Sequence, residues 1–155
     1  MKTTGKILLV LMAVTFVVSY AFAQEARRTV KITAMEGDVS VKLAGGKWTP
    51  AVLGADLGER DILKTKANST ATLNVDGNGE TATVDLSPNS EVMMAELFRD
   101  AQKGTQRTLL DLTIGKIMIK AKKLHSEEER FEVKTPTTIV GVRGTTFEVD
   151  VEAVE

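Results

Sequence analysis

The sequence contains no cysteine and a single histidine, His125, and these two shortages exclude several kinds of site. Without cysteine no disulfide can form, so the fold must be held together by packing alone. A zinc site needs three or four ligands, which one histidine beside Ser126 in a polar loop does not supply. We therefore expect no metal and no cofactor, and we interpret the histidine as a solvated loop residue.

The sequence also lacks a recognisable catalytic arrangement. A Ser-His-Asp site needs a positioned nucleophile, and no serine lies in the Gly-x-Ser-x-Gly pattern of a nucleophile elbow. Carboxylates are numerous, with 21 Asp and Glu residues, but no pair of them stands out as an acid–base couple. The sequence predicts a protein that is not an enzyme. An enzyme that uses a carboxylate pair in a cleft is the alternative.

Positive charge is not in excess, because 20 Lys and Arg residues face 21 Asp and Glu residues. Binding to nucleic acid needs a concentrated basic face, so this composition argues against such a partner. The lysines at 116, 120, 122 and 123 could form an anion-binding patch. They fit better as the solvated face of a strand, where charges discourage edge-to-edge pairing.

The one long apolar run lies at the N-terminus. Lys2 and Lys6 are followed by the largely apolar residues 7–18, and then by Ala21-Phe22-Ala23, the small-x-small pattern that signal peptidase reads. We predict a signal peptide over residues 1–23 and a periplasmic or secreted mature chain without a membrane association. The alternative is a retained anchor, because the run approaches the length that spans a bilayer.

Residues 24–155 are predicted to form one all-β domain. Apolar and polar residues alternate along many short segments, which places every second side chain on one face of a strand. Valine, isoleucine and threonine are frequent in these segments and suit a pleated surface. The inward faces give an expected core of Val39, Val41, Leu73, Val75, Val84, Leu86, Leu112, Ile117, Ile119, Phe131, Val133, Phe147 and Val149.

Turn signals separate the alternating segments. Asp76-Gly77-Asn78-Gly79 predicts a hairpin, because glycine and asparagine accept the positive φ that such turns need. Ser87-Pro88-Asn89 predicts another turn. Many short strands between turns indicate an irregular sandwich or a β-solenoid-like stack. Residues 95–103 are the best helical candidate, but strand patterns on both sides argue against a helix there.

Several segments, taken in their order and spacing, resemble the FecR domain family. They include residues 36–41, 61–65 and 112–117, and the most specific block lies at 140–147. The resemblance extends over about residues 32–151. It implies an all-β domain outside the cytoplasmic membrane that acts as a non-enzymatic interaction or sensing module.

The best-known proteins of this resemblance relay an iron–siderophore signal from an outer-membrane receptor to a sigma factor. They have a cytoplasmic segment before the domain and a further module after it. We recognise neither here, so we do not expect sigma-factor regulation. We expect binding to an envelope protein, a peptide or a glycan, for example by main-chain pairing at a strand edge. The alternative is a membrane-anchored signalling component that retains its N-terminal helix.

The most specific block contains Gly141, Arg143, Gly144 and Thr145, and we expect it to be architectural. Two glycines three residues apart indicate a bend where a Cβ would clash or where φ is positive. By the resemblance, Arg143 is expected to hold strands together, because a guanidinium can bind a carboxylate or several carbonyls at once. Asp61 is the expected partner.

Overall fold

A computed structural model describes residues 27–77, 79–124, 126 and 128–152, so the predicted signal peptide lies outside the described residues. The described chain is all-β, as the sequence predicts, and no part of it forms a helix long and apolar enough to cross a bilayer. The strands are β1 (Val30–Glu36), β2 (Val39–Lys42), β3 (Trp48–Pro50), β4 (Asp56–Leu57), β5 (Ile62–Thr65), β6 (Thr70–Val75), β7 (Ala82–Leu86), β8 (Glu91–Asp100), β9 (Thr105–Ala121), β10 (Arg130–Lys134), β11 (Ile139–Val142) and β12 (Thr146–Val151).

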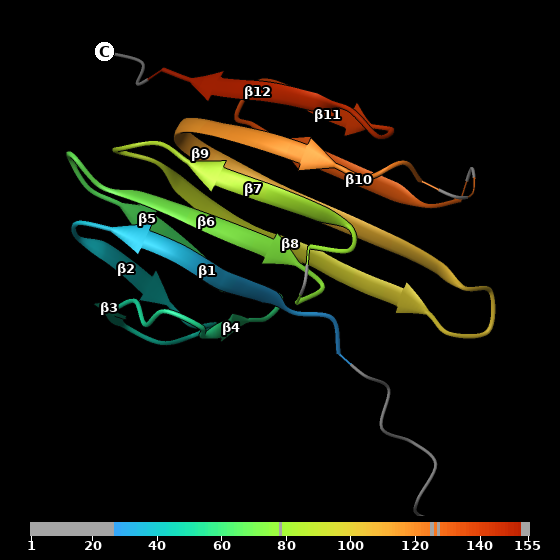
Figure 1. The fold of residues 1–155 in the computed structure, drawn as a ribbon, viewed down its shortest axis with the longest axis horizontal. Helices are drawn as coiled ribbons and strands as arrows, with labels where there is room; N and C mark the ends of the chain where they lie inside the picture. Colours follow the sequence, from blue (N-terminus) through green and yellow to red (C-terminus); the bar gives the residue numbers. More distant parts are fainter. Residues whose placement is uncertain (1–26, 78, 125, 127, 153–155) are drawn as a thin grey trace, which may run out of the picture.

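All twelve strands belong to one connected sheet that curls around a single core as a half-barrel (Figure 1). The main path runs β3-β2-β5-β8-β9-β7-β6-β1-β4, and β10, β11 and β12 are attached beside β9. The described pairings are antiparallel except that of β9 with β10. The strands therefore form a curled antiparallel sheet, and they do not repeat as equivalent parallel coils.

Strand β9, 17 residues long, belongs to both walls of the core. Its first half pairs with β8 and β10, and its second half pairs with β7 and β12. Between the halves Gly115 adopts a φ of 91°. The buried positions change there from Leu110 and Leu112 to Ile117 and Ile119. Because side chains alternate along a strand, this change from even to odd positions requires an irregularity, and Gly115 provides it.

The bend in β9 lies against the turn that precedes β8. A Cβ on Gly115 would lie 2.5 Å from Ser90 Cα and 2.6 Å from the Asn89 carbonyl oxygen. The buried Ser90 hydroxyl accepts a hydrogen bond from Lys116 N at 2.9 Å and donates to the Lys116 carbonyl at 3.1 Å. The Thr65 hydroxyl accepts from Ser90 N at 3.0 Å. The corner is therefore fixed by close backbone contact and by buried hydroxyl groups.

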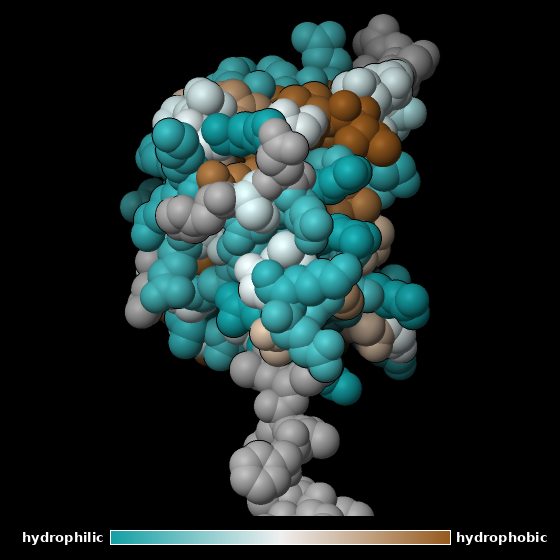
Figure 2. Space-filling view, turned by 90° about the vertical axis from the view of Figure 1, so that its right-hand side faces the viewer, coloured by the Kyte–Doolittle hydropathy of each residue, from teal (hydrophilic) through white to brown (hydrophobic). Residues whose placement is uncertain are grey.

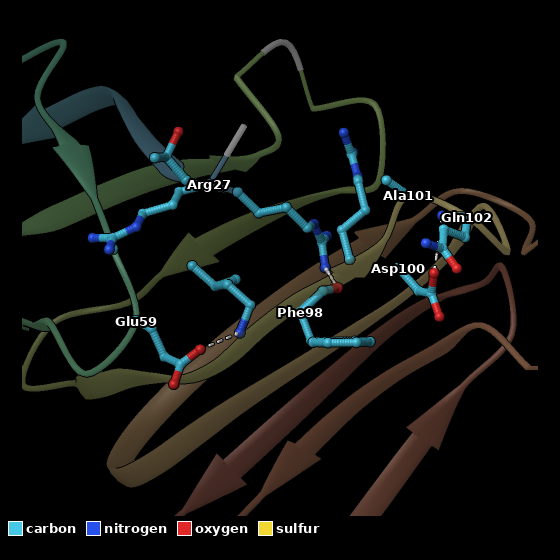
Figure 3. A pocket seen from close by; sticks show the side chains of 11 residues that line it. Arg27, Glu59, Phe98, Asp100, Ala101 and Gln102 are labelled. Carbon is cyan, nitrogen blue, oxygen red and sulfur yellow. Dashed lines mark hydrogen bonds between the residues drawn. The ribbon is translucent and has the colours of Figure 1, made fainter. Parts of the chain in front are cut away.

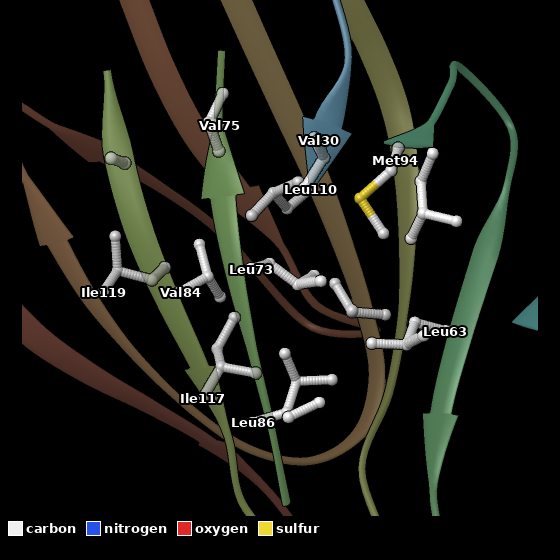
Figure 4. Packing of buried hydrophobic residues seen from close by; sticks show 14 of the residues in the cluster. Val30, Leu63, Leu73, Val75, Val84, Leu86, Met94, Leu110, Ile117 and Ile119 are labelled. Atoms are coloured by element: carbon white, nitrogen blue, oxygen red, sulfur yellow. The ribbon is translucent and has the colours of Figure 1, made fainter. Parts of the chain in front are cut away.

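The expected core is buried, with the exception of Phe147, which is only partly buried (Figure 4). Alternation fails where a strand is irregular. Ala34 is exposed although Val30 and Ile32 are buried, because the register of β1 against β6 shifts between Ile32 and Ala34. Residues 95–103 form the end of β8 and a turn, and no helix.

The predicted hairpin at Asp76 is confirmed. Strands β6 and β7 pair antiparallel from Ala71 opposite Leu86 to Val75 opposite Ala82. Asp76 begins the turn with a φ of 60°, and the structure does not describe Asn78.

Replacing Gly115 with alanine is expected to lower the free energy of unfolding by about 3–5 kcal/mol. The alanine would be held at a positive φ, which disfavours side chains, and its Cβ would also overlap the backbone of Ser90. Gly104→Ala is the matched control, because Gly104 has a φ of 66° but nothing within 4 Å of its added Cβ. It should cost only about 1–2 kcal/mol. Urea unfolding followed by circular dichroism measures both, and equal losses would contradict the close contact at the corner.

Candidate functional site

A hollow of about 740 Å³ opens beside the start of β1 (Figure 3). We call it the N-terminal hollow. Residues 27–29 line one side, and the link between β4 and β5 contributes Gly58 and Glu59. Residues 97–102, from the end of β8 and the following turn, line the opposite side. A space of this size is in the range that proteins use to bind small ligands.

Arg28 lies at the base of this hollow, and its side chain is only 1% exposed. Its Nε and Nη2 atoms donate to the two carboxylate oxygens of Asp76 at 2.9 and 2.7 Å. Nη1 donates to the carbonyls of Phe98 at 3.2 Å and Arg107 at 2.7 Å, and Nη2 also donates to the Thr108 hydroxyl at 2.9 Å. All five guanidinium protons thus have an acceptor.

Asp76 is held in its ionised form. Burial by itself raises the pKa of this carboxyl. Hydrogen bonds from Arg28 and the Thr81 hydroxyl, together with the positive charges of Arg28 and Arg99, outweigh the burial and hold the pKa below its usual value. Asp76 therefore serves as a structural anion, and it is unsuited to proton transfer near neutral pH.

The Arg28–Asp76 pair joins the segment before β1, the turn between β6 and β7, and the β8–β9 hairpin. Sequence reasoning did not find it. The two residues are 48 positions apart, and each lies beside an alternating segment without being part of its pattern. From the sequence, Asp76 is recognisable only as a residue of a turn. No local signal shows that its carboxylate faces the arginine that precedes the first strand.

The predicted pairing of Arg143 with Asp61 is absent. Asp61 is buried, but its carboxylate oxygens accept hydrogen bonds from Ala44 N at 2.8 Å and Gly58 N at 2.7 Å. Arg143 is exposed and lines a smaller hollow of about 330 Å³ beside β10 and β11. The reason is topological: β8, β9 and β10 lie between β5, which follows Asp61, and β11, which precedes Arg143.

The two glycines of the most specific block differ in their surroundings. Gly144 has a φ of 80°, and a Cβ there would lie 2.6 Å from Lys123 Cα, which fits the expected tight bend. Gly141 lies within β11 and has neither a positive φ nor a neighbour within 4 Å of an added Cβ. Thr145 contributes its carbonyl, which accepts a hydrogen bond from Ala121 N at 3.2 Å.

Metal binding finds no support among the described side chains. No group of three or more acidic or histidine residues in that part of the chain is arranged to hold an ion. His125 lies outside the described residues.

Arg28→Ala is expected to lower the free energy of unfolding by about 3–5 kcal/mol, because it leaves the Asp76 carboxylate buried without its partner. Arg28→Lys should recover only part of this loss, since an ammonium cannot reproduce the five planar donors. The matched control is Arg143→Ala, an exposed arginine whose loss should change stability by less than about 0.5 kcal/mol. Urea unfolding compares the three variants. A larger loss at Arg143 than at Arg28 would contradict this assignment.

The pH dependence of stability should show the Asp76 carboxylate directly. Its pKa in the folded protein lies below the ordinary value of 3.8, so its contribution is fully present above that pH. The contribution is lost as the pH falls below 3.8 through the folded pKa. Asp76→Asn removes this titration. The difference in unfolding free energy between wild type and Asp76→Asn should therefore shrink with acidification, and a constant or growing difference would contradict the assignment.

Comparison with known proteins identifies a family that this chain matches. Residues 61–154 match the model of the family described as FecR protein, a range that runs from the residue before β5 through β12. Strand β1 lies before the matched range, yet it pairs between β4 and β6 in the same sheet. Searches of curated proteins and of solved structures give no match. The matched range covers most of the chain and all four described pairings of β9, and the chain belongs to the FecR family.

Proposed function

We propose that this chain is an exported, non-enzymatic interaction or sensing module of the cell envelope. The match to the FecR family over residues 61–154 carries the proposal, because FecR domains are signalling and sensing modules. In this reading the mature chain begins at Gln24 and acts in the periplasm or outside the cell. Its partner is another envelope protein, a peptide or a glycan.

The chemistry of the N-terminal hollow supports binding over catalysis. A general acid or base works best with a pKa near the working pH. The buried carboxylate of Asp76, which binds the lining residue Arg28, instead has a lowered pKa and is fixed in place. Such a pair holds a surface in a defined shape, which favours recognition of a partner.

The sheet also offers main-chain groups for recognition. Within the described chain β3, β4, β11 and β12 each pair with one neighbouring strand only. Ile139 of β11 is 60% exposed. Figure 2 shows a largely polar side of the molecule with an apolar group near its top, at the height of β11 and β12 in Figure 1. Edges of this kind accept an added strand from a partner.

The second candidate is a signalling component that keeps its N-terminal segment as an anchor. The length of the N-terminal apolar run favours it, because this run approaches the length that spans a bilayer. Both candidates place the same domain in the envelope. They differ in whether residues 1–23 remain attached.

Intact mass of the protein isolated from its native envelope tests the export. We expect a mass that corresponds to a chain beginning at Gln24, in a soluble periplasmic or extracellular fraction. Ala23→Lys is the control, because a long charged side chain at this position should block signal-peptidase cleavage and leave the full-length mass. A full-length wild-type chain in the membrane fraction would support the anchored form. A full-length chain in the cytoplasm would overturn both candidates.

A further inference from the structure

The second half of β8 has a free edge within the described chain. Strand β9 pairs with β8 along its whole length, whereas β5 pairs only with residues 91–93. One more pair of main-chain hydrogen bonds joins Met94 to Arg60 and Asp61, and no described strand pairs beyond it on that side. Figure 1 shows the β8–β9 hairpin projecting past the neighbouring strands.

A side chain occupies the next acceptor position along this edge. Glu59 Oε2 accepts a hydrogen bond from Leu97 N at 3.4 Å (Figure 3). The carboxylate thus stands where a carbonyl oxygen of an added strand would lie. Because main-chain groups alternate along a strand, those of Arg99 point to the same side as those of Leu97. We call these groups of Leu97 and Arg99 the β8 edge.

The N-terminal hollow runs along the β8 edge and gives it a particular chemistry. Phe98 is 44% exposed, and the guanidinium of Arg107 lies 5.5 Å from its ring centre. Arg27 is exposed. The side chain of Arg99 is 45% exposed, and its Nη2 lies 3.8 Å from Oδ1 of Asp76, which Arg28 already binds. The surface beside the edge therefore combines an aromatic ring with accessible positive charge.

Two carboxylates in or next to the hollow are already bound within the protein. Asp76 is paired with Arg28, and Asp100 Oδ1 accepts hydrogen bonds from Gln102 N at 2.9 Å and Lys103 N at 3.0 Å. Glu59 is exposed and makes only the long bond to the edge, so an incoming carbonyl can displace it into solvent. The three exposed arginines beside the edge, Arg27, Arg99 and Arg107, outnumber the carboxylates of Glu59 and Asp100, so positive charge is in excess there.

We propose that the β8 edge binds an extended acidic peptide segment of a partner protein as an added strand. This inference rests on the proposed function and names its partner class. Main-chain groups of the peptide pair with Leu97 and Arg99 and replace the carboxylate of Glu59. Acidic side chains on one face of the peptide meet Arg27 and Arg99, and apolar side chains on the other face cover Phe98.

The test uses a fluorescein-labelled octapeptide of alternating glutamate and valine, titrated into the purified protein and read by fluorescence anisotropy. We expect saturable binding that is lost when lysine replaces glutamate in the peptide. Arg99→Gln should weaken binding about tenfold, as expected for the loss of one favourable charge contact. Arg143→Gln, an exposed arginine on the far side of β9 and β10, should leave binding unchanged.

Two further measurements separate strand addition from simple charge attraction. Arg99→Pro removes the same side-chain charge as Arg99→Gln, so the measure of strand pairing is the loss beyond the tenfold effect of Arg99→Gln. We expect Arg99→Pro to abolish binding, because proline cannot donate at the edge and its ring obstructs pairing, while edge strands tolerate it. Urea unfolding checks that this variant remains folded. Hydrogen exchange should show new protection at the amides of Leu97 and Arg99 when the peptide is bound.

The proposal is overturned if the lysine peptide binds equally well, if Arg143→Gln weakens binding as much as Arg99→Gln, or if protection appears on β11 or β12 instead. It is also overturned if the β8 edges of two copies pair, seen as a doubled mass with protection in the absence of peptide. If the protein is exported and cleaved before Gln24 but does not bind the glutamate peptide, only this inference is wrong and the proposed function stands. If the protein binds the peptide but is found full-length in the cytoplasm, the proposed function is wrong and the peptide site at the β8 edge stands.

Discussion

The backbone of β9 turns at Gly115 against Ser90, and the shape of the sheet follows from that contact. The first half of the strand carries β8 and β10, and the second half carries β7 and β12. Because the bend shifts the inward positions by one, Leu112 and Ile117 both reach the same core from opposite walls. A side chain at Gly115 would meet the backbone of Ser90, so the curl depends on a residue that contributes no packing of its own.

The Arg28–Asp76 pair gives the curled sheet a fixed opening. It connects the segment before β1 to the β6–β7 turn and to the projecting β8–β9 hairpin. The segment before β1 and the hairpin line two sides of the N-terminal hollow. Breaking a buried pair of this kind destabilises the fold strongly, because either partner alone would be an unpaired buried charge. The hollow and the β8 edge are therefore held in one shape before any partner arrives, which lowers the entropic cost of binding.

Much of the fold could be predicted because its determinants are local. Alternation along β6, β7 and the second half of β9 identifies which side chains face inward, and burial of Leu73, Val84 and Ile119 follows from it. The turn at Asp76 could be recognised because few residue types accept a positive φ. Irregular positions escaped the pattern: the shift after Ile32 exposes Ala34, and Phe147 on the edge strand β12 has a neighbour on one side only.

The sequence by itself determined the strand class, most of the core and the family, because alternation, turn chemistry and motif spacing are properties of neighbouring residues. Only the tertiary structure decided which charges meet. Arg143 and Asp61 fall in recognisable motifs, yet three strands separate the ends that carry them. Arg28 and Asp76 lie 48 residues apart, and they meet because β1 and β6 are adjacent in the sheet. Ion pairing depends on strand order, and strand order is set by how the whole sheet closes around its core.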